Sequence, residues 1–527
     1  MPTVAREAMR WNVSDRAAAA IVNATLIDFG IISPDDTSCT VDRQKIIRAK
    51  RKCRADLNGN FLATKKSKYD GVFFDGKEIS TLNVSNATGH HKNIQVKQEH
   101  TVLVSEPQSA YLGHVTTQGK TAKEISDALL AFLGTRDAIP DVRVLGADST
   151  ATNTGPHGGI IRLIEIGRGS KVHWSICMLH TNELPLRHLL EKKDGPTSGS
   201  NSFKGPVGKS LMKMDEWAWN PKFTPIKNGP ELPVLPEKVL DDLSSDQKYL
   251  YLAASSIKTG KIDRKLLHLT PGPICHSRWL TTACRLMAAY MKKSSFDRKA
   301  KGILHTLVVF IVTNYVPCWF AIKLKPYIAD ASSHVLLAVQ LLRVLPKTTQ
   351  AIVAPYVKSW HAHPENLLVS LLSSENGAHR KFAVDKILEL RCGDDEGDTS
   401  PRIFHPPALN LGAEDLLDLI DWNKEGLSES CLTCHLTIAE IEELRETPLQ
   451  VPRFPSHTQA VERFVREMTD VSQRVAGAEA RDGFIRARMA SRAQYKKANT
   501  KRDFTLMAAS KSPEDDDKYH RPKIKHP

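Results

Sequence analysis

Two carboxylates in this sequence stand where an apolar run gives way to small and polar residues. Asp75 follows the apolar residues of GVFFDG, and Asp148 follows those of VRVLGAD. In sheets flanked by helices, ligands and catalytic groups gather beyond the strand ends, because the loops there bring side chains into solvent. If the two strands are adjacent, the carboxylates converge. Joined by a third acid, they could hold two divalent cations about 4 Å apart for in-line phosphoryl transfer, and their hard oxygen atoms favour Mg²⁺ or Mn²⁺ over zinc.

A turn-forming role is the alternative for each of these residues. Taken singly, an Asp at a strand end is more often a turn former or a helix cap. Two of them in a basic chain leave the structural and the catalytic interpretations both open.

The elements that would position the two acids follow from residue periodicity. Runs of β-branched and aromatic residues predict strands at 69–76, 91–107, 142–148 and 172–180, bounded by turn formers. Helical spacing predicts helices at 121–135 and 158–167, and a further helix follows the last strand. Strands in a run, followed by strands alternating with helices, are typical of a mixed sheet flanked by helices.

The sequence pattern after the last predicted strand is mostly helical. A Gly, Ser and Pro-rich break at 193–208 ends the strand series, and the following residues predict an all-α insertion. The apolar run 303–322 contains His305, Asn314 and Pro317, so we expect a buried helix with a bend rather than a membrane span. We expect five parts: a basic helical region 1–67, core 68–195, insertion 196–445, core helix 446–486, and a disordered mixed-charge tail 487–527.

A net charge of +14 is the unusual bulk feature of these 527 residues, and it favours a polyanionic partner, most simply nucleic acid. The predicted helix 42–57 concentrates basic residues, among them Lys45, Arg48 and Lys52. They could follow a phosphate backbone or act as a nuclear localisation signal. A solvated helix is the alternative. The N-terminus lacks the apolar stretch of a secretory signal, and nine scattered cysteines indicate a reducing compartment.

The order of motifs resembles the hAT superfamily of DNA transposases over about residues 68–480. Asp75 matches the family's first acid, and DSTATNTG, with Asp148, Asn153 and Gly155, is similar to its second motif. The motifs that match after these are a C-x-x-H at a strand end (Cys177, His180), an Arg-Trp pair (Arg278, Trp279), and an acid on a late helix in VERFV (Glu462).

That resemblance implies a ribonuclease H-like α/β core interrupted by a large all-α insertion, in a nuclear DNA-binding protein. It also implies that Asp75, Asp148 and Glu462 hold Mg²⁺ or Mn²⁺, that Asn153 orients Asp148 or binds the loop backbone, and that Arg278 and Trp279 contact DNA. For Trp279, packing under the insertion is the favoured alternative. A second copy of the chain is a further candidate partner, and a domesticated derivative without catalysis remains the alternative function.

The sequence departs from the family in two places. No module with paired Cys and His at zinc-finger spacing precedes the core, and Val-Glu-Arg replaces the usual Ser-Glu-Arg context at Glu462. CLTCH at 431–435 could join Cys177 and His180 in a zinc site, although nothing local requires the halves to meet. Hydrolase and ATPase interpretations are weaker still, because no nucleophile motif and no G-x-x-x-x-G-K-[ST] accompany the polar clusters.

Overall fold

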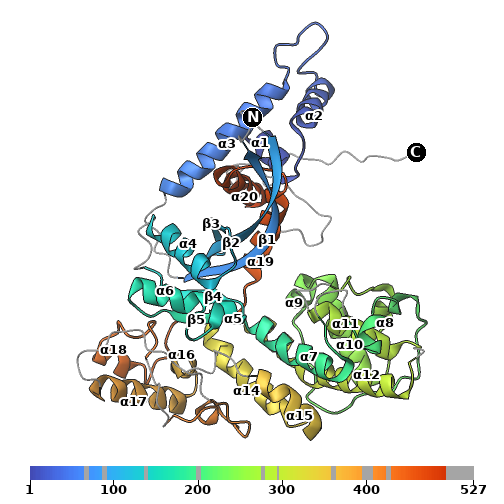
Figure 1. Ribbon diagram of the computed structural model, residues 1–527, viewed down its shortest axis with the longest axis vertical. Helices are drawn as coiled ribbons and strands as arrows, with labels where there is room; N and C mark the ends of the chain where they lie inside the picture. Colours follow the sequence, from blue (N-terminus) through green and yellow to red (C-terminus); the bar gives the residue numbers. More distant parts are fainter. Residues whose placement is uncertain are drawn as a thin grey trace, which may run out of the picture. The chain divides into compact units, whose positions relative to one another are not determined.

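The computed structural model describes residues 1–63, 71–85, 92–135, 141–197, 203–274, 279–293, 296–357, 364–393, 408–422 and 429–493. They form a mixed α/β fold with one five-stranded mixed sheet and many helices (Figure 1). The chain divides into two compact units. Unit 1 comprises Met1–Ser67, Glu78–Gln98 and Phe464–Pro527, and unit 2 comprises Lys68–Lys77 and Glu99–Arg463.

The sheet has the strand order β3-β2-β1-β4-β5. Its strands are β1 (Gly71–Ser85), β2 (Lys92–Glu106), β3 (Ala110–Thr117), β4 (Val144–Ala147) and β5 (His173–Ile176). β4 runs parallel to both β1 and β5, and β3 runs antiparallel to β2. The sequence predicted four of these strands and missed β3, whose pattern is short and interrupted by Gly113.

Two helices of unit 2 pack together beside the sheet, namely α4 (Ala122–Gly134) and α6 (Ile160–Arg168) (Figure 1). α4 begins with a capping box, in which the Thr121 hydroxyl accepts from the Glu124 N–H and the Glu124 carboxylate accepts from Thr121. The short helix α5 (Ala151–Thr154) follows β4, and α7 (Met178–Asp194) follows β5. Each strand after β3 therefore leads directly into a helix.

Between α7 and α19 (Gln459–Ser472) the described residues form helices and no named strand. The helices of eight or more residues there are α10 (Ser245–Thr259), α11 (Trp279–Met291), α12 (Arg298–Phe310), α13 (Val316–Leu324), α14 (Ala331–Leu342), α16 (Pro364–Leu372) and α17 (Gly377–Gly393). The shorter ones are α8 (Pro206–Ser210), α9 (Glu237–Asp242), α15 (Lys347–Val353) and α18 (Ile438–Glu443). They share a continuous buried core that includes Leu286, Leu307 and Phe320.

The apolar run that the sequence analysis placed inside the protein is buried. The helical stretch Arg298–Leu324 is long and apolar enough to cross a membrane by length and composition, and 78% of its apolar window is buried. A π-helical turn at Ile311–Tyr315 interrupts it, and Pro317 begins the next segment. The Asn314 side-chain amide donates to the Ala338 carbonyl at 3.3 Å, so helix packing satisfies this polar group inside the run.

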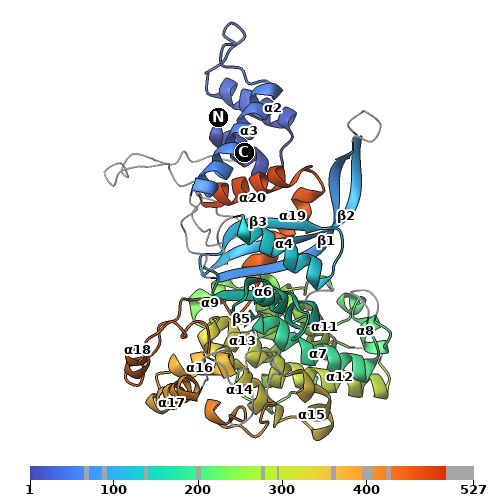
Figure 2. The same cartoon turned by 60° about the vertical axis from the view of Figure 1, so that its left-hand side comes forward.

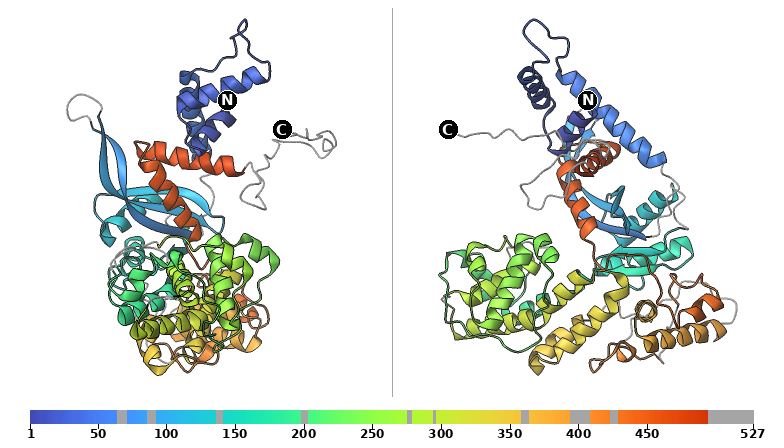
Figure 3. Two further views of the ribbon diagram at one scale, coloured as in Figure 1. Left: turned by 90° about the vertical axis from the view of Figure 1, so that its right-hand side faces the viewer. Right: turned by 180° about the vertical axis from the view of Figure 1, so that it is seen from behind.

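Unit 1 brings helices from the two ends of the chain together. α1 (Pro2–Arg10) and α3 (Arg43–Ala63) both pack on α20 (Ala478–Ala493), and α2 (Asp15–Asp28) packs on α3 (Figures 2 and 3). The Ser14 hydroxyl caps α2 by accepting from the Ala17 N–H at 3.1 Å. Residues 487–493, which were expected to belong to a disordered tail, are helical, because α20 buries Ala487 against α1 and α3. Residues 494–527 lie outside the described part.

Candidate functional site

The two strand-borne acids lie side by side in unit 2. Gly71 pairs with Val144 and Phe73 with Gly146, which is a constant offset of 73 residues between the parallel strands β1 and β4. The same offset places Asp75 beside Asp148 (148 − 75 = 73). Neighbouring strands lie about 4.8 Å apart, and residues opposite each other point to the same face of the sheet. The convergence predicted from the sequence is therefore present for this pair.

The surroundings of Asp75 differ from the expected strand end. β1 continues to Ser85, so Asp75 is the fifth residue of a 15-residue strand rather than its last. The pairing of β1 with β4 is registered only from Gly71 to Phe73, while β1 also borders β2 in the sheet. Asp75 thus stands just beyond that paired segment. Asp148, by contrast, directly follows the last residue of β4, as predicted.

Hydrogen bonds fix the carboxylate of Asp148. Its Oδ1 atom accepts from the Thr150 N–H at 3.1 Å, from the Thr150 hydroxyl at 2.8 Å and from the Asn153 side-chain amide at 2.6 Å. The bond from the Thr150 backbone forms an Asx turn, so Asp148 does form a turn at the strand end. The bond from the Asn153 side chain holds the Asp148 carboxylate in its orientation. Oδ2 accepts none of these bonds and lies 4.0 Å from the His180 Nδ1 atom.

The electrostatics of Asp75 reveal an acidic cluster. Burial is the largest cause that raises the pKa of Asp75 from 3.8 to about 7, and the carboxylates of Asp148, Glu462 and Glu99 raise it further. The Gly76 N–H, 2.8 Å from the Asp75 Oδ1 atom, acts in the opposite direction. All three acids of the predicted site are therefore close enough to interact as charges.

Glu99 was not predicted from the sequence. It is buried in β2, and its Oε1 atom would lie only 2.7 Å from a Cβ atom at Gly76. Its sequence context, VKQEHTVLV, gives no signal beyond an acid entering an apolar run. It becomes a neighbour of Asp75 because β1 and β2 lie side by side in the sheet.

Glu462 reaches the site from the start of α19 (Gln459–Ser472). The segment before this helix runs along the end of β5: the Met178 N–H donates to the Ser456 carbonyl at 2.8 Å, and the Ser175 hydroxyl donates to the Pro455 carbonyl at 3.2 Å. The Glu462 N–H then donates to the Thr458 carbonyl at 3.0 Å in the first turn of the helix. These contacts place a residue 314 positions from Asp148 beside the two strand acids.

Carboxylate oxygens are suitable ligands for Mg²⁺ or Mn²⁺. The pKa of Asp75 is raised first by burial and then by the neighbouring carboxylates, and both effects favour a proton or a cation at this place. Among the described residues, no group of three or more His, Cys, Asp and Glu side chains is arranged as it stands to hold a metal ion. The chemistry of the donor set fits a divalent cation.

Comparisons with known proteins add little to this geometry. No protein family and no curated protein matches the chain. Among solved structures, the chain is similar to the Drosophila P element transposase strand transfer complex, with 10% identity, a TM-score of 0.27, and coverage of 90% of this chain and 98% of that chain. This TM-score does not establish a shared fold.

The remaining motif residues near the site have structural surroundings. A Cβ atom at Gly155 would lie 2.8 Å from the Ala151 carbonyl oxygen, so the turn after α5 leaves little room for a side chain there. Burial raises the pKa of the Cys177 thiol to about 11, which keeps it protonated. Among the described residues, Cys177 and His180 form no metal-ligating group with the CLTCH cysteines, so the zinc alternative finds no support.

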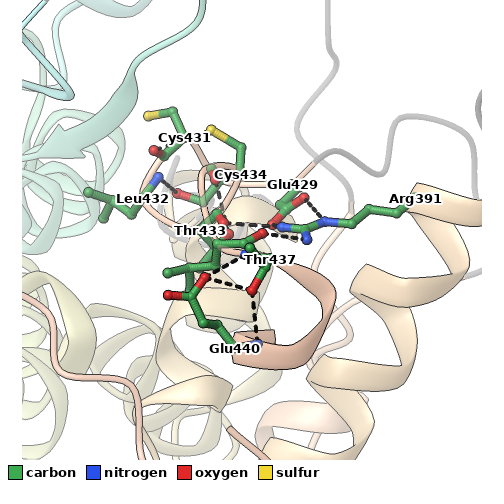
Figure 4. Close-up of polar contacts among 10 residues, drawn as sticks. Arg391, Glu429, Cys431, Leu432, Thr433, Cys434, Thr437 and Glu440 are labelled. Atoms are coloured by element: carbon green, nitrogen blue, oxygen red, sulfur yellow. Dashed lines mark hydrogen bonds and ion pairs between the residues drawn. The ribbon is translucent and has the colours of Figure 1, made fainter. Parts of the chain in front are cut away.

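A compact turn holds the CLTCH cysteines (Figure 4). The Arg391 guanidinium pairs with Glu429 at 2.6 Å and donates to the Thr433 and Leu436 carbonyls, which fixes the chain around the two thiols. The Cys431 thiol donates to the Arg143 carbonyl at 3.1 Å, and burial raises its pKa. The hydrogen bond and the raised pKa both indicate that Cys431 has a packing role.

The residues predicted to contact DNA differ from one another in how exposed they are. Arg278 lies outside the described residues, while Trp279 begins α11 and packs, partly buried, against the helical core. Lys45, Arg48 and Lys52 are all exposed on α3. At 3.6 residues per turn their Cα–Cβ directions lie within about 60° of one another, so they form one stripe.

Two other basic residues of α3 face inward instead. The Lys50 ammonium pairs with Asp15 at 2.7 Å, and the Arg54 guanidinium lies 5.0 Å from the centre of the Phe484 ring. The basic helix α3 therefore has one exposed cationic stripe and one face that packs against its neighbours. The number of basic residues in the sequence did not by itself predict this division.

Proposed function

We propose that this chain is a hAT transposase-like, nuclear DNA-binding protein whose acidic cluster supports metal-dependent phosphoryl transfer. The observation that carries the proposal is the placement of Asp75 beside Asp148 on adjacent parallel strands, with Glu462 close enough to act on the pKa of Asp75. The strand order β3-β2-β1-β4-β5, with β4 parallel to both of its neighbours and β3 antiparallel to β2, supports a ribonuclease H-like core, and the helices between α7 and α19 correspond to its insertion.

In this proposal the chain's own residues prepare the site. Asn153 and Thr150 hold the Oδ1 atom of Asp148, which leaves Oδ2 for a cation. Asp75 and Glu462 would complete the ligand set for Mg²⁺ or Mn²⁺. Bound there, two such cations would activate a water or a DNA 3′-hydroxyl and stabilise the leaving oxygen as the P–O bond of the DNA strand breaks.

The catalytic part of the proposal is tested by plasmid nicking with Mn²⁺. We expect nicking by the wild-type protein and a loss of at least about 100-fold in Asp148→Asn, because the substitution removes a charged ligand. Asp127→Asn, an exposed carboxylate of α4 in the same unit, is the matched control and should nick at the wild-type rate. Equal activity in wild type and Asp148→Asn would exclude the assigned role.

A domesticated, non-catalytic protein that binds DNA or protein is the second candidate function. It is favoured by the hydrogen bonding of Asp148, whose Oδ1 atom is already occupied by three protein donors. No nicking by the wild-type protein, combined with retained DNA binding, would support this alternative.

DNA binding itself is tested through its salt dependence. Each phosphate contact contributes a slope of about −0.9 in log K against log salt for duplex DNA. Replacing Lys45, Arg48 and Lys52 together by Gln should reduce the slope by roughly 2 to 3, because the three exposed cations share one stripe. The control replaces Arg298, Lys299 and Lys301, exposed on α12, by Gln. An equal change in both triple variants would rule out a specific role for the α3 stripe.

A further inference from the structure

A cavity in unit 1 gathers cations from segments that are far apart in the sequence. It has a volume of about 540 Å³ and is lined in part by Arg16 at the start of α2, by Arg43 and Lys50 of α3, and by Arg474 between α19 and α20. Asp15 is the carboxylate among the lining residues. Four basic side chains against one acidic side chain leave the walls with a formal charge of +3.

The partners of these cations determine what the cavity can bind. The Lys50 ammonium is buried, donates to the Val13 carbonyl at 3.0 Å and pairs with Asp15 at 2.7 Å, so that carboxylate is already neutralised. Arg474 pairs with Asp470 at 3.1 Å. Arg16 and Arg43 are exposed, and neither guanidinium makes a hydrogen bond or an ion pair within the described part of the chain.

We propose that this cavity binds a phosphate-bearing anion, with Arg16 and Arg43 as its principal contacts. A guanidinium presents a planar fork of donors that matches two phosphate oxygens, and charge-assisted bonds of this kind are strong. The volume lies within the range of about 300–1,000 Å³ that is typical of small-ligand sites, which is larger than one phosphate requires. The Phe484 ring in the lining offers an apolar surface for the organic part of the ligand.

The same phosphate chemistry is available from a free nucleotide or from a DNA strand, and the proposal does not use the acidic cluster of unit 2. The test is isothermal titration of the full-length protein with inorganic pyrophosphate in EDTA. We expect binding to the wild type and about tenfold weaker binding to Arg16→Gln and to Arg43→Gln, because each variant loses one charge-assisted contact. Arg51→Gln, exposed on α3 and outside the cavity lining, should bind like the wild type.

Competition then identifies the source of the phosphate. Displacement of pyrophosphate by adenosine triphosphate but not by a short DNA duplex would assign the cavity to a free nucleotide, and displacement by the duplex would assign it to the DNA backbone. No binding to the wild type, or equal binding to the wild type and both cavity variants, would overturn the proposal. Asp148→Asn should still bind pyrophosphate, so failure of the phosphoryl-transfer proposal is distinguishable from failure of this one.

Discussion

Asp75 is buried beside the carboxylates of Asp148, Glu462 and Glu99. The free-energy cost of ionising Asp75 in the folded protein can be measured as a pH-dependent change in stability. Its pKa of about 7 in the folded protein lies above the ordinary value of 3.8, so folding favours its protonated form. The associated stability is present below about pH 4 and is lost as the pH rises toward 7. In EDTA at pH 8, Asp75→Asn should therefore be more stable than the wild type by roughly 3–4 kcal/mol, whereas at pH 4 the two should be nearly equal.

Urea unfolding at both pH values measures this difference. Asp127→Asn is the control, because Asp127 is exposed on α4 and pairs with Lys123 at the surface. A wild-type protein that is as stable as Asp75→Asn at pH 8 would contradict the assigned electrostatics. Added Mn²⁺ should stabilise the wild type more at pH 8 than at pH 6, because a cation competes with the proton for the Asp75 carboxylate.

The register between β1 and β4 determines whether Asp75 and Asp148 lie close together. Gly146 allows this register because it leaves room for the Phe73 ring. A Cβ atom at Gly146 would lie 2.1 Å from the Phe73 ring, and Phe73 is buried. Gly146→Ala should destabilise the protein by about 1–3 kcal/mol through overpacking and should also reduce Mn²⁺-dependent nicking, because it separates the strands that carry Asp75 and Asp148.

Thermal unfolding and nicking rates test this prediction against Gly158→Ala. Gly158 has no atom within 4 Å of its would-be Cβ, so that substitution should be nearly neutral. If Gly146→Ala unfolds and nicks like Gly158→Ala, the close packing of β1 on β4 is not required.

The sequence predicted those helices and strands that are determined by residues close to one another along the chain. The helix predicted at 121–135, the strand before Asp148 and the helix that carries Lys45 all follow from nearby residues and are present. Continuation of β1 past Asp75 could not be predicted in this way, because there β1 lies beside β2, and the Ser80 hydroxyl donates to the Gln95 side chain. The proximity of Glu99 has the same origin. Glu462 was placed by its resemblance to a motif, and the contacts of Ser456 with Met178 explain how it reaches the sheet.

At the scale of the whole molecule, the two ends of the chain build one unit. Ala5 and Met9 of α1 and Cys53 of α3 are buried in a cluster with Ala487 of α20. Deleting residues 478–527 should therefore expose this cluster, and burial of one side chain the size of Met contributes about 1.5–3 kcal/mol. In a small helical unit this loss should suffice to unfold α1 and α3, while the sheet of unit 2 keeps its own core.

Hydrogen exchange followed by mass spectrometry measures the result segment by segment. Peptides from α1 and α3 should lose protection in the deletion variant, and peptides from β4 and β5 should keep theirs, because Val144, Leu145 and Ile176 are buried within unit 2. Deleting only residues 494–527 is the matched control, since it retains the described length of α20. Full protection of α1 and α3 without α20 would mean that the N-terminal helices are stable alone.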